Sequence, residues 1–208
     1  LSTIAYRINK STSYALEGSI FVSGASMKWL KDELGIIKNV NDSQSLASSI
    51  KDNNGVYFVP AFTGLGAPHW KPDARGTIVG LTASSGKAEI VRAALEAVAY
   101  QSVDLFDAMA ADGQKPIEVK VDGAMSNNDW LIQFLSNISK TKIKKSYNSE
   151  TTSQGAAILS SIGSGLLSSL KESSKFWKLN KSYNPIMQSA EIKNYRNGWN
   201  KAIKRTIM

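Results

Sequence analysis

The segment 119–138 has the residue order of a small-ligand site. An alternating apolar strand pattern is followed by an Asp-Gly-Ala turn at 122–124, and an amphipathic helix pattern begins near Asn128. Small residues between a strand and a helix let a ligand approach the backbone closely. The N–H groups at a helix start also favour an anion such as a phosphate. A nucleotide fits such a turn, but taken alone the pattern is more typical of a tight structural turn between a strand and a helix.

The turn contains a single glycine, Gly123, and so lacks two common nucleotide motifs. It is neither Gly-x-x-x-x-Gly-Lys-Ser/Thr nor Gly-x-Gly-x-x-Gly, which argues against a P-loop and against a dinucleotide-binding turn. Asp122 and Asp129 flank the turn, but Asp129 falls in the first helical turn, where a carboxylate is favoured by the helix dipole. No pair of acidic residues has a persuasive active-site setting.

The content of Cys and His restricts the chemistry further. The chain has no Cys and a single His, His69, so it has no disulfide framework, no thiolate metal site and no Cys nucleophile. Every mechanism that needs two His residues is excluded, and a Ser-His-Asp triad would depend on His69 alone. The elaborate segment 62–70 around it is either a structured loop at a domain or subunit contact or a plain connection, and we expect a surface or packing role for this His instead of a catalytic one. The sequence predicts no catalytic residue and no metal ligand.

Composition indicates one α/β domain. The 208 residues are 42% hydrophobic, strand patterns alternate with helix patterns, and no linker marks a second domain. The net charge is +8, but the lysines are spread along the chain without interleaved aromatics, so we expect no nucleic-acid partner. No apolar run reaches the ~20 residues of a membrane span and no signal peptide opens the chain, so we expect a cytoplasmic protein. The strand pattern at Leu1 suggests a piece of something longer.

Hydrophobic periodicity gives the expected elements. Strands are predicted near 4–8, 14–16, 56–59, 77–81, 117–121 and 143, and helices near 19–35, 42–51, 86–110, 130–138, 155–167 and 195–207. Gly24 is expected inside the first helix, where it costs roughly 1 kcal/mol relative to Ala, so we expect packing or a ligand against it. Gly155 is interpreted as a site of close helix packing.

Several motifs carry a resemblance to a known family. They are Tyr-Ala-Leu-Glu-Gly-Ser-Ile-Phe-Val-Ser-Gly-Ala at 14–25, Val-Pro-Ala-Phe-Thr-Gly-Leu-Gly-Ala-Pro-His-Trp at 59–70, Asp-Gly-Ala-Met-Ser-Asn-Asn-Asp-Trp-Leu at 122–131, Thr-Ser-Gln-Gly-Ala-Ala at 152–157 and Tyr-Arg-Asn-Gly-Trp at 195–199. Together they resemble the C-terminal, nucleotide-binding half of the FGGY carbohydrate kinases. The Gly-Leu-Gly-Ala-Pro-x-Trp run resembles the glycerol kinases of this family more than its other sugar kinases.

The resemblance implies a fold and a nucleotide site. The expected fold is a ribonuclease-H-like, actin-like ATPase domain over residues 1–208, with a mixed sheet flanked by helices and without its first strand. The implied ligand is ATP with Mg²⁺, and the implied nucleotide-binding positions are Gly24, Lys28, Ala124 and Asn128. Ala124 departs from the family's usual Gly, and Lys28 stands where Gln is common.

The resemblance also implies what this chain lacks. The family's catalytic Asp, its glycerol-binding residues and its phosphate loop correspond to positions before Leu1, so we expect the chain alone to be inactive. The full enzyme is expected to phosphorylate glycerol to sn-glycerol 3-phosphate and, by analogy, to form a homo-oligomer. Two alternatives remain open: the same domain of a xylulose or gluconate kinase, and a non-catalytic ATP-binding module.

Overall fold

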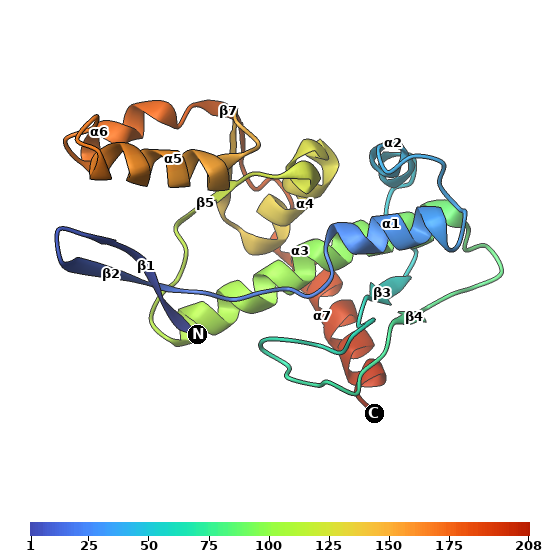
Figure 1. Cartoon of the computed structure of the whole chain (residues 1–208). Coiled ribbons are helices and arrows are strands. Elements are labelled where there is room, and N and C mark those ends of the chain that lie inside the picture. The colour runs from blue at the N-terminus through green and yellow to red at the C-terminus, as the bar shows by residue number, and fades with distance from the viewer.

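A long helix, α3 (Lys87–Ala111), lies at the centre of the computed structural model, which describes all 208 residues (Figure 1). Every residue from 91 to 100 is buried. The sequence predicts a single apolar stripe here, whereas the helix is enclosed on all sides, as expected where small residues such as Ala alternate with larger apolar ones. Helix α3 is therefore the scaffold on which the other elements are placed.

Four helices and one strand pair surround α3 and share its core. Trp199 stacks on Tyr100 at 5.1 Å between ring centroids, inside a cluster of 31 buried apolar residues. The strands of the pair are antiparallel. The surrounding elements are α1 (Gly24–Asp32), α2 (Asp42–Ser48), β3 (Tyr57–Val59), β4 (Thr77–Val79), α4 (Asp129–Ser139) and α7 (Ser189–Thr206).

A three-stranded mixed sheet carries the turn that the sequence singles out. Strand β5 (Glu118–Val121) runs parallel to β6 (Lys142–Ser146), and β7 (Leu179–Tyr183) pairs antiparallel with β6. A short 3₁₀ turn, η1 (Ala124–Asn127), links β5 to α4. The α/β class with a mixed sheet is thus confirmed, whereas β7 lies where only a loop is expected.

A hairpin and a helical segment project from the body (Figure 1). Strands β1 (Ser2–Ile8) and β2 (Ser11–Leu16) are joined by two residues with φ of 49° and 67°, a conformation that suits the right-handed twist of a two-residue hairpin. The turn lies at 9–10, whereas the sequence predicts it at 10–12. The helical segment comprises α5 (Thr151–Gly163), α6 (Leu170–Ser173) and the 3₁₀ turn η2 (Ser174–Phe176).

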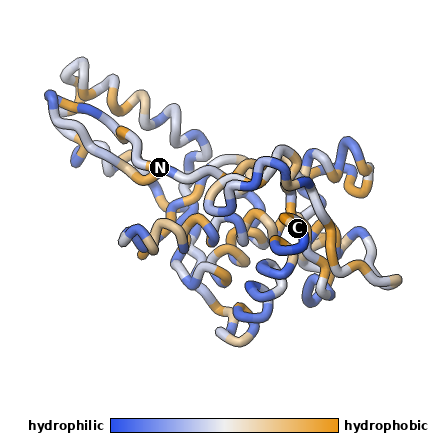
Figure 2. The backbone as a smooth tube through the Cα atoms, turned by 90° about the horizontal axis from the view of Figure 1, so that it is seen from below, coloured by the Kyte–Doolittle hydropathy of each residue, from blue (hydrophilic) through white to orange (hydrophobic).

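Helix α5 is not packed as the sequence predicts. None of its side chains is buried, and no atom lies within 4 Å of a Cβ built on Gly155, so the interpretation of Gly155 as a packing site is wrong. Figure 2 shows that this projecting helix nevertheless contains apolar stretches. The helix also begins at Thr151 and ends at Gly163, several residues earlier than expected.

The first helix begins later than its periodicity suggests. Residues 19–23 are irregular, and Gly24 is the first residue of α1. The amide of Gln101 donates to the carbonyl of Val22 at 3.4 Å, so this segment is fixed along α3 instead of coiling. Because Gly24 begins the helix, the free-energy cost predicted for a glycine in a helix interior does not apply to it. No helix anywhere in the structure is both long and apolar enough to cross a bilayer.

Candidate functional site

The turn after β5 is held by its own hydrogen bonds. Gly123 has φ of +78°, a backbone conformation in which glycine is strongly favoured. The Ser126 N–H and hydroxyl both donate to the Gly123 carbonyl, at 3.1 and 2.7 Å. The Thr151 hydroxyl donates to Asp122. Hydrogen bonds within the chain therefore fix the shape of the turn at Asp122, Gly123 and Ser126.

A hollow of about 170 Å³ lies between this turn and the start of α2. Ala124 and Asn128, two of the predicted nucleotide-binding positions, both line this hollow, and residues from much earlier in the chain form its second wall. Three of its eight lining residues are hydrophobic and the others are polar: Val40, Asn41, Ser43, Gln44, Ala124, Met125, Asn127 and Asn128. The hollow is the candidate functional site.

Asn128 joins the two walls of the hollow. Its side-chain oxygen caps α4 by accepting from the Leu131 N–H at 3.0 Å, and its amide donates to the Ser43 hydroxyl oxygen at 3.2 Å. A carboxamide has two lone pairs and two N–H bonds. One of each is therefore left for a ligand, while the two existing bonds hold the side chain in place.

Two of the N-terminal donors of α4 are occupied. The Asp129 N–H donates to the Gln44 side-chain oxygen at 2.7 Å, and the Leu131 N–H donates to Asn128. The expectation of free N–H groups at the start of this helix is therefore wrong for both residues. At these two positions a ligand in the hollow would contact side chains, because the backbone N–H groups already have acceptors.

The Asp129 carboxylate has a structural role. It accepts from the Lys181 ammonium and from the Tyr183 hydroxyl, each at 2.6 Å. These two bonds hold the pKa of Asp129 below its usual value. Since both partners lie on β7, Asp129 fastens the start of α4 to the sheet, which agrees with its interpretation as a first-turn helix residue.

The other two predicted positions are placed differently. A Cβ built on Gly24 would lie 3.6 Å from the Cγ and Sδ of Met125, so the start of α1 lies against the turn. Lys28 is exposed and lines a separate hollow together with Trp29 and Glu33. The structure thus groups Gly24, Ala124 and Asn128, and it sets Lys28 apart from them.

Sequence reasoning misses Ser43 and Gln44. Their contacts reach residues 85 positions later, and α2 reads as Asp-Ser-Gln-Ser-Leu-Ala-Ser, a polar stretch without a motif. Only the tertiary structure identifies them. No three Asp, Glu or His side chains converge closely enough to hold a metal ion.

Comparison with known families and sequences gives a consistent result. Residues 4–164 match the C-terminal domain of the FGGY family of carbohydrate kinases. The chain is 48% identical over 207 residues to a glycerol kinase from Coxiella burnetii (strain Dugway 5J108-111), and 49% identical over 208 residues to one from Gluconobacter oxydans (strain 621H). Each alignment covers 100% of this chain and 41% of the relative. The chain therefore spans about two fifths of the length of these curated relatives.

Solved structures agree with this comparison. A crystal structure of Plasmodium falciparum glycerol kinase with ADP superimposes with a TM-score of 0.91 at 35% identity, covering 100% of this chain and 42% of that one. Xylulose kinase from Lactobacillus acidophilus superimposes with a TM-score of 0.80 at 24% identity, covering 96% of this chain and 40% of that one, which is evidence for the fold alone.

The structural neighbours confirm the expected ribonuclease-H-like, actin-like ATPase fold. The family match extends over most of the chain, from the projecting hairpin through the candidate site to the end of α5. The chain belongs to the FGGY family of carbohydrate kinases.

Proposed function

We propose that residues 1–208 form the ATP-side, C-terminal domain of a glycerol kinase. The complete enzyme would transfer the γ-phosphate of MgATP to glycerol and produce sn-glycerol 3-phosphate. One observation carries the proposal: the polar hollow at Ala124–Asn128 occurs in a chain that superimposes, with a TM-score of 0.91, on a glycerol kinase solved with ADP.

Each predicted site residue has a role in this proposal. Asn128 would offer its remaining N–H and lone pair to the base or ribose. Gly24 and Ala124 have little or no side chain, so the backbone would pass close to the nucleotide. Lys28, one turn after Gly24, would supply a positive charge toward the phosphates from outside the hollow. Mg²⁺ would accompany the phosphates, and we assign it no ligand in this chain because no acidic or His cluster is present.

Two other functions fit the same fold. A xylulose or gluconate kinase is supported only by structures at 24% and 23% identity, against 48% for a glycerol kinase. A non-catalytic ATP-binding module would share the hollow but lack phosphoryl transfer. By analogy with the family, we extend the proposal to a cytoplasmic enzyme that associates with further copies of itself.

Nucleotide binding by this chain is tested by titration calorimetry with ADP and with ATP. We expect the wild-type chain to bind both nucleotides. Asn128→Asp keeps the helix cap but removes the amide donor, so it should weaken binding by about 5- to 100-fold if that donor faces the nucleotide. Asn200→Ala, on the exposed face of α7, is the matched control and should bind like wild type. A wild-type chain without detectable nucleotide binding contradicts the proposal.

The choice of acceptor needs the complete active site. A polypeptide that joins this chain to the N-terminal part of the kinase should form ADP from MgATP with glycerol, and not with xylulose or gluconate. The 208-residue chain alone should form no ADP with any of them. Turnover with a sugar in preference to glycerol would favour the sister-kinase alternative, and binding without turnover in the joined polypeptide would favour the non-catalytic module.

A further inference from the structure

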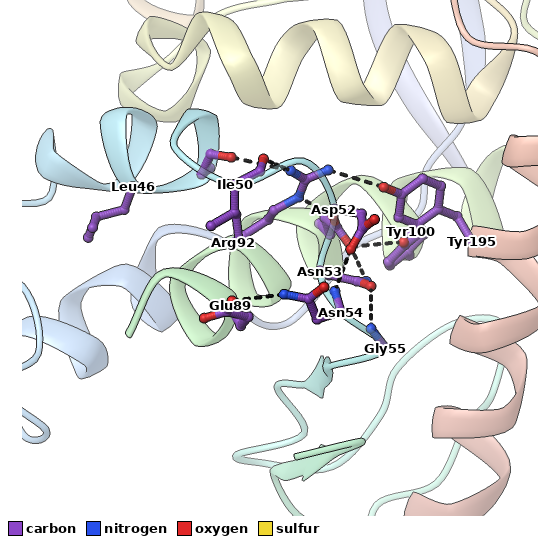
Figure 3. A network of polar contacts seen from close by, with 12 residues as sticks. Leu46, Ile50, Asp52, Asn53, Asn54, Gly55, Glu89, Arg92, Tyr100 and Tyr195 are labelled. Carbon is purple, nitrogen blue, oxygen red and sulfur yellow. Dashed lines mark hydrogen bonds and ion pairs between the residues drawn. The ribbon is translucent and has the colours of Figure 1, made fainter. Parts of the chain in front are cut away.

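Arg92 is a buried cation at the meeting point of several elements. It lies on α3 and is 5% exposed. Figure 3 shows its guanidinium between the end of α2 and Tyr195 of α7. Its Nε donates to Glu96 at 2.9 Å, and one terminal nitrogen donates to the Tyr195 hydroxyl oxygen at 3.1 Å. The guanidinium is therefore fixed in position and in orientation.

The other terminal nitrogen of Arg92 holds the C-terminal end of α2 and the turn that follows it. It donates to the carbonyl of Ile50 at 2.6 Å and to that of Ala47 at 3.3 Å. Carbonyls at a helix C-terminus have no partner within the helix. Arg92 supplies that partner, so the position of α2 depends on the position of this guanidinium.

The opposite end of α2 forms one wall of the candidate site. Ser43 accepts from the Asn128 amide, and Gln44 accepts from the Asp129 N–H. Helix α2 has only seven residues, which corresponds to a length of about 10 Å. A shift at the Arg92 end is therefore transmitted directly to the hollow.

Arg92 also contacts the other wall. Its guanidinium carbon lies 5.0 Å from the ring centroid of Trp130, two residues after Asn128. The Trp130 ring stacks on Phe134 of α4 at 5.2 Å, so it is itself held in place. Arg92 thus contacts both elements that enclose the hollow, although it is not among the residues that line it.

When Glu96 is ionised, it balances the charge of Arg92 within the same network. Glu96 is fully buried, and it accepts from Arg92, from the Asn53 amide at 2.7 Å and from the Tyr100 hydroxyl at 3.0 Å. Only a planar guanidinium offers several donors in fixed directions. A Lys at this position keeps the charge but cannot donate to Glu96, to α2 and to Tyr195 at the same time.

We propose that Arg92 is a positioning residue for the nucleotide hollow, because it fixes α2 against the start of α4. This inference rests on the proposed function in assuming that the hollow takes a nucleotide. It predicts that nucleotide affinity depends on a residue that the nucleotide does not touch.

The test uses two substitutions in one network. Arg92→Lys loses the fixed contacts to α2 and should weaken ADP binding by about 2- to 30-fold. Tyr195→Phe removes a hydrogen bond from the same guanidinium but leaves α2 and Trp130 untouched, so its ADP dissociation constant should match that of wild type. Thermal unfolding of both variants shows whether each is folded and how much stability it loses.

A second measurement reports the geometry without nucleotide. The amide resonance of Asp129 and the side-chain amide resonance of Asn128 monitor the two bonds to α2. Both should move in Arg92→Lys and stay in place in Tyr195→Phe. If Arg92→Lys does not fold, the double variant Arg92→Met/Glu96→Gln, which removes both buried charges, takes its place with the same expected result.

The outcomes separate the two proposals. A wild-type chain that binds no ADP contradicts the nucleotide proposal, while the two resonances still decide whether Arg92 sets the shape of the hollow. Unmoved resonances and unchanged ADP affinity in folded Arg92→Lys overturn the inference. Equal losses of ADP affinity in Arg92→Lys and Tyr195→Phe also overturn it, because they indicate general loosening of the core.

Discussion

The indole N–H of Trp199 donates to the carboxylate of Asp104 at 2.8 Å, in the buried contact between α7 and α3. Trp199 is fully buried and Asp104 is 8% exposed. The imidazole Nε2 of His69 lies 3.2 Å from the same carboxylate oxygen. One acceptor therefore ties the C-terminal helix and the loop 62–70 to the central helix. This arrangement agrees with the expectation that His69 has a packing role.

Asp104→Ala should lower the free energy of unfolding by about 1–3 kcal/mol, because the Trp199 N–H would remain buried without an acceptor. The matched control is Asp107→Ala, one turn further along α3. Asp107 is exposed and pairs with Arg196 at 2.6 Å, so its loss should cost less than about 1 kcal/mol. Urea unfolding of both variants measures the difference, and equal losses would contradict the assigned role of Asp104.

Two glycines in helices should respond oppositely to replacement by Ala. In α5, Gly155→Ala meets open space and should raise the free energy of unfolding by about 0.5–1 kcal/mol, since Ala is the better helix former. In α7, a Cβ at Gly198 would overlap the ring and hydroxyl of Tyr57. Gly198→Ala should therefore lower the free energy of unfolding by about 1–3 kcal/mol. Thermal unfolding of each variant checks the sign. A stabilised Gly198→Ala would show that Tyr57 moves aside at little cost.

The sequence predicts best those elements whose apolar residues recur at a clear spacing, even where, as in α3, the observed burial is wider than the predicted stripe. Helix α3 and the strand–turn–helix unit around Ala124 are correctly predicted because their apolar residues recur at helical or strand spacing. Strand β7 is missed because its Leu-Asn-Lys-Ser-Tyr sequence has no clear alternation, and only pairing with β6 makes it a strand. Residues 19–23 show the opposite error, since helical spacing there is overridden by contacts along α3.

The sequence predicts only one of the two walls of the candidate site. Ala124 and Asn128 belong to a local motif, so the turn can be recognised without a structure. Ser43 and Gln44 have no local signal, because their role depends on α2 lying beside α4. The sequence does not reveal the role of Arg92 for the same reason. Arg92 lies on a helix dominated by apolar residues, and its partners on α2, α4 and α7 are far away in the sequence.

Stability should depend on pH through Glu96. Burial raises the pKa of Glu96 to about 7, against the opposing hydrogen bonds from Arg92, Asn53 and Tyr100. Its ordinary value is 4.5. Between these values the folded chain holds a proton that the unfolded chain has lost. The free energy of unfolding should therefore fall as pH rises from about 4.5 to about 7, by on the order of 3 kcal/mol, and then level off.

Glu96→Gln removes this titration. When urea unfolding is measured from pH 5 to pH 8, the free energy of unfolding should fall with pH in wild type and not in Glu96→Gln. Glu172→Gln is the control. Lys175 and Ser168 lower the pKa of Glu172 to about 2, so its titration lies below this range. A slope that persists unchanged in Glu96→Gln would show that another group is responsible.

Ala124→Gly should tighten nucleotide binding by the chain. Ala124 lines the hollow beside Asn128. The family resemblance implies a glycine at this position, so the methyl group of Ala124 is an addition to the implied pattern. We expect a modest effect, about 2- to 10-fold in the ADP dissociation constant, because one methyl is the smallest possible obstruction to close backbone approach.

The same substitution should cost about 0.4–1 kcal/mol of stability, since Gly gives the unfolded chain more freedom. Unfolding must therefore be measured beside ADP titration, so that a loosened turn is not mistaken for a change in contact. Ser153→Gly, on the exposed side of α5, provides a glycine substitution away from the hollow and should leave ADP affinity unchanged. If folded Ala124→Gly binds ADP no more tightly than wild type, the methyl group does not crowd the nucleotide, and Ala124 is only a tolerated residue of the turn.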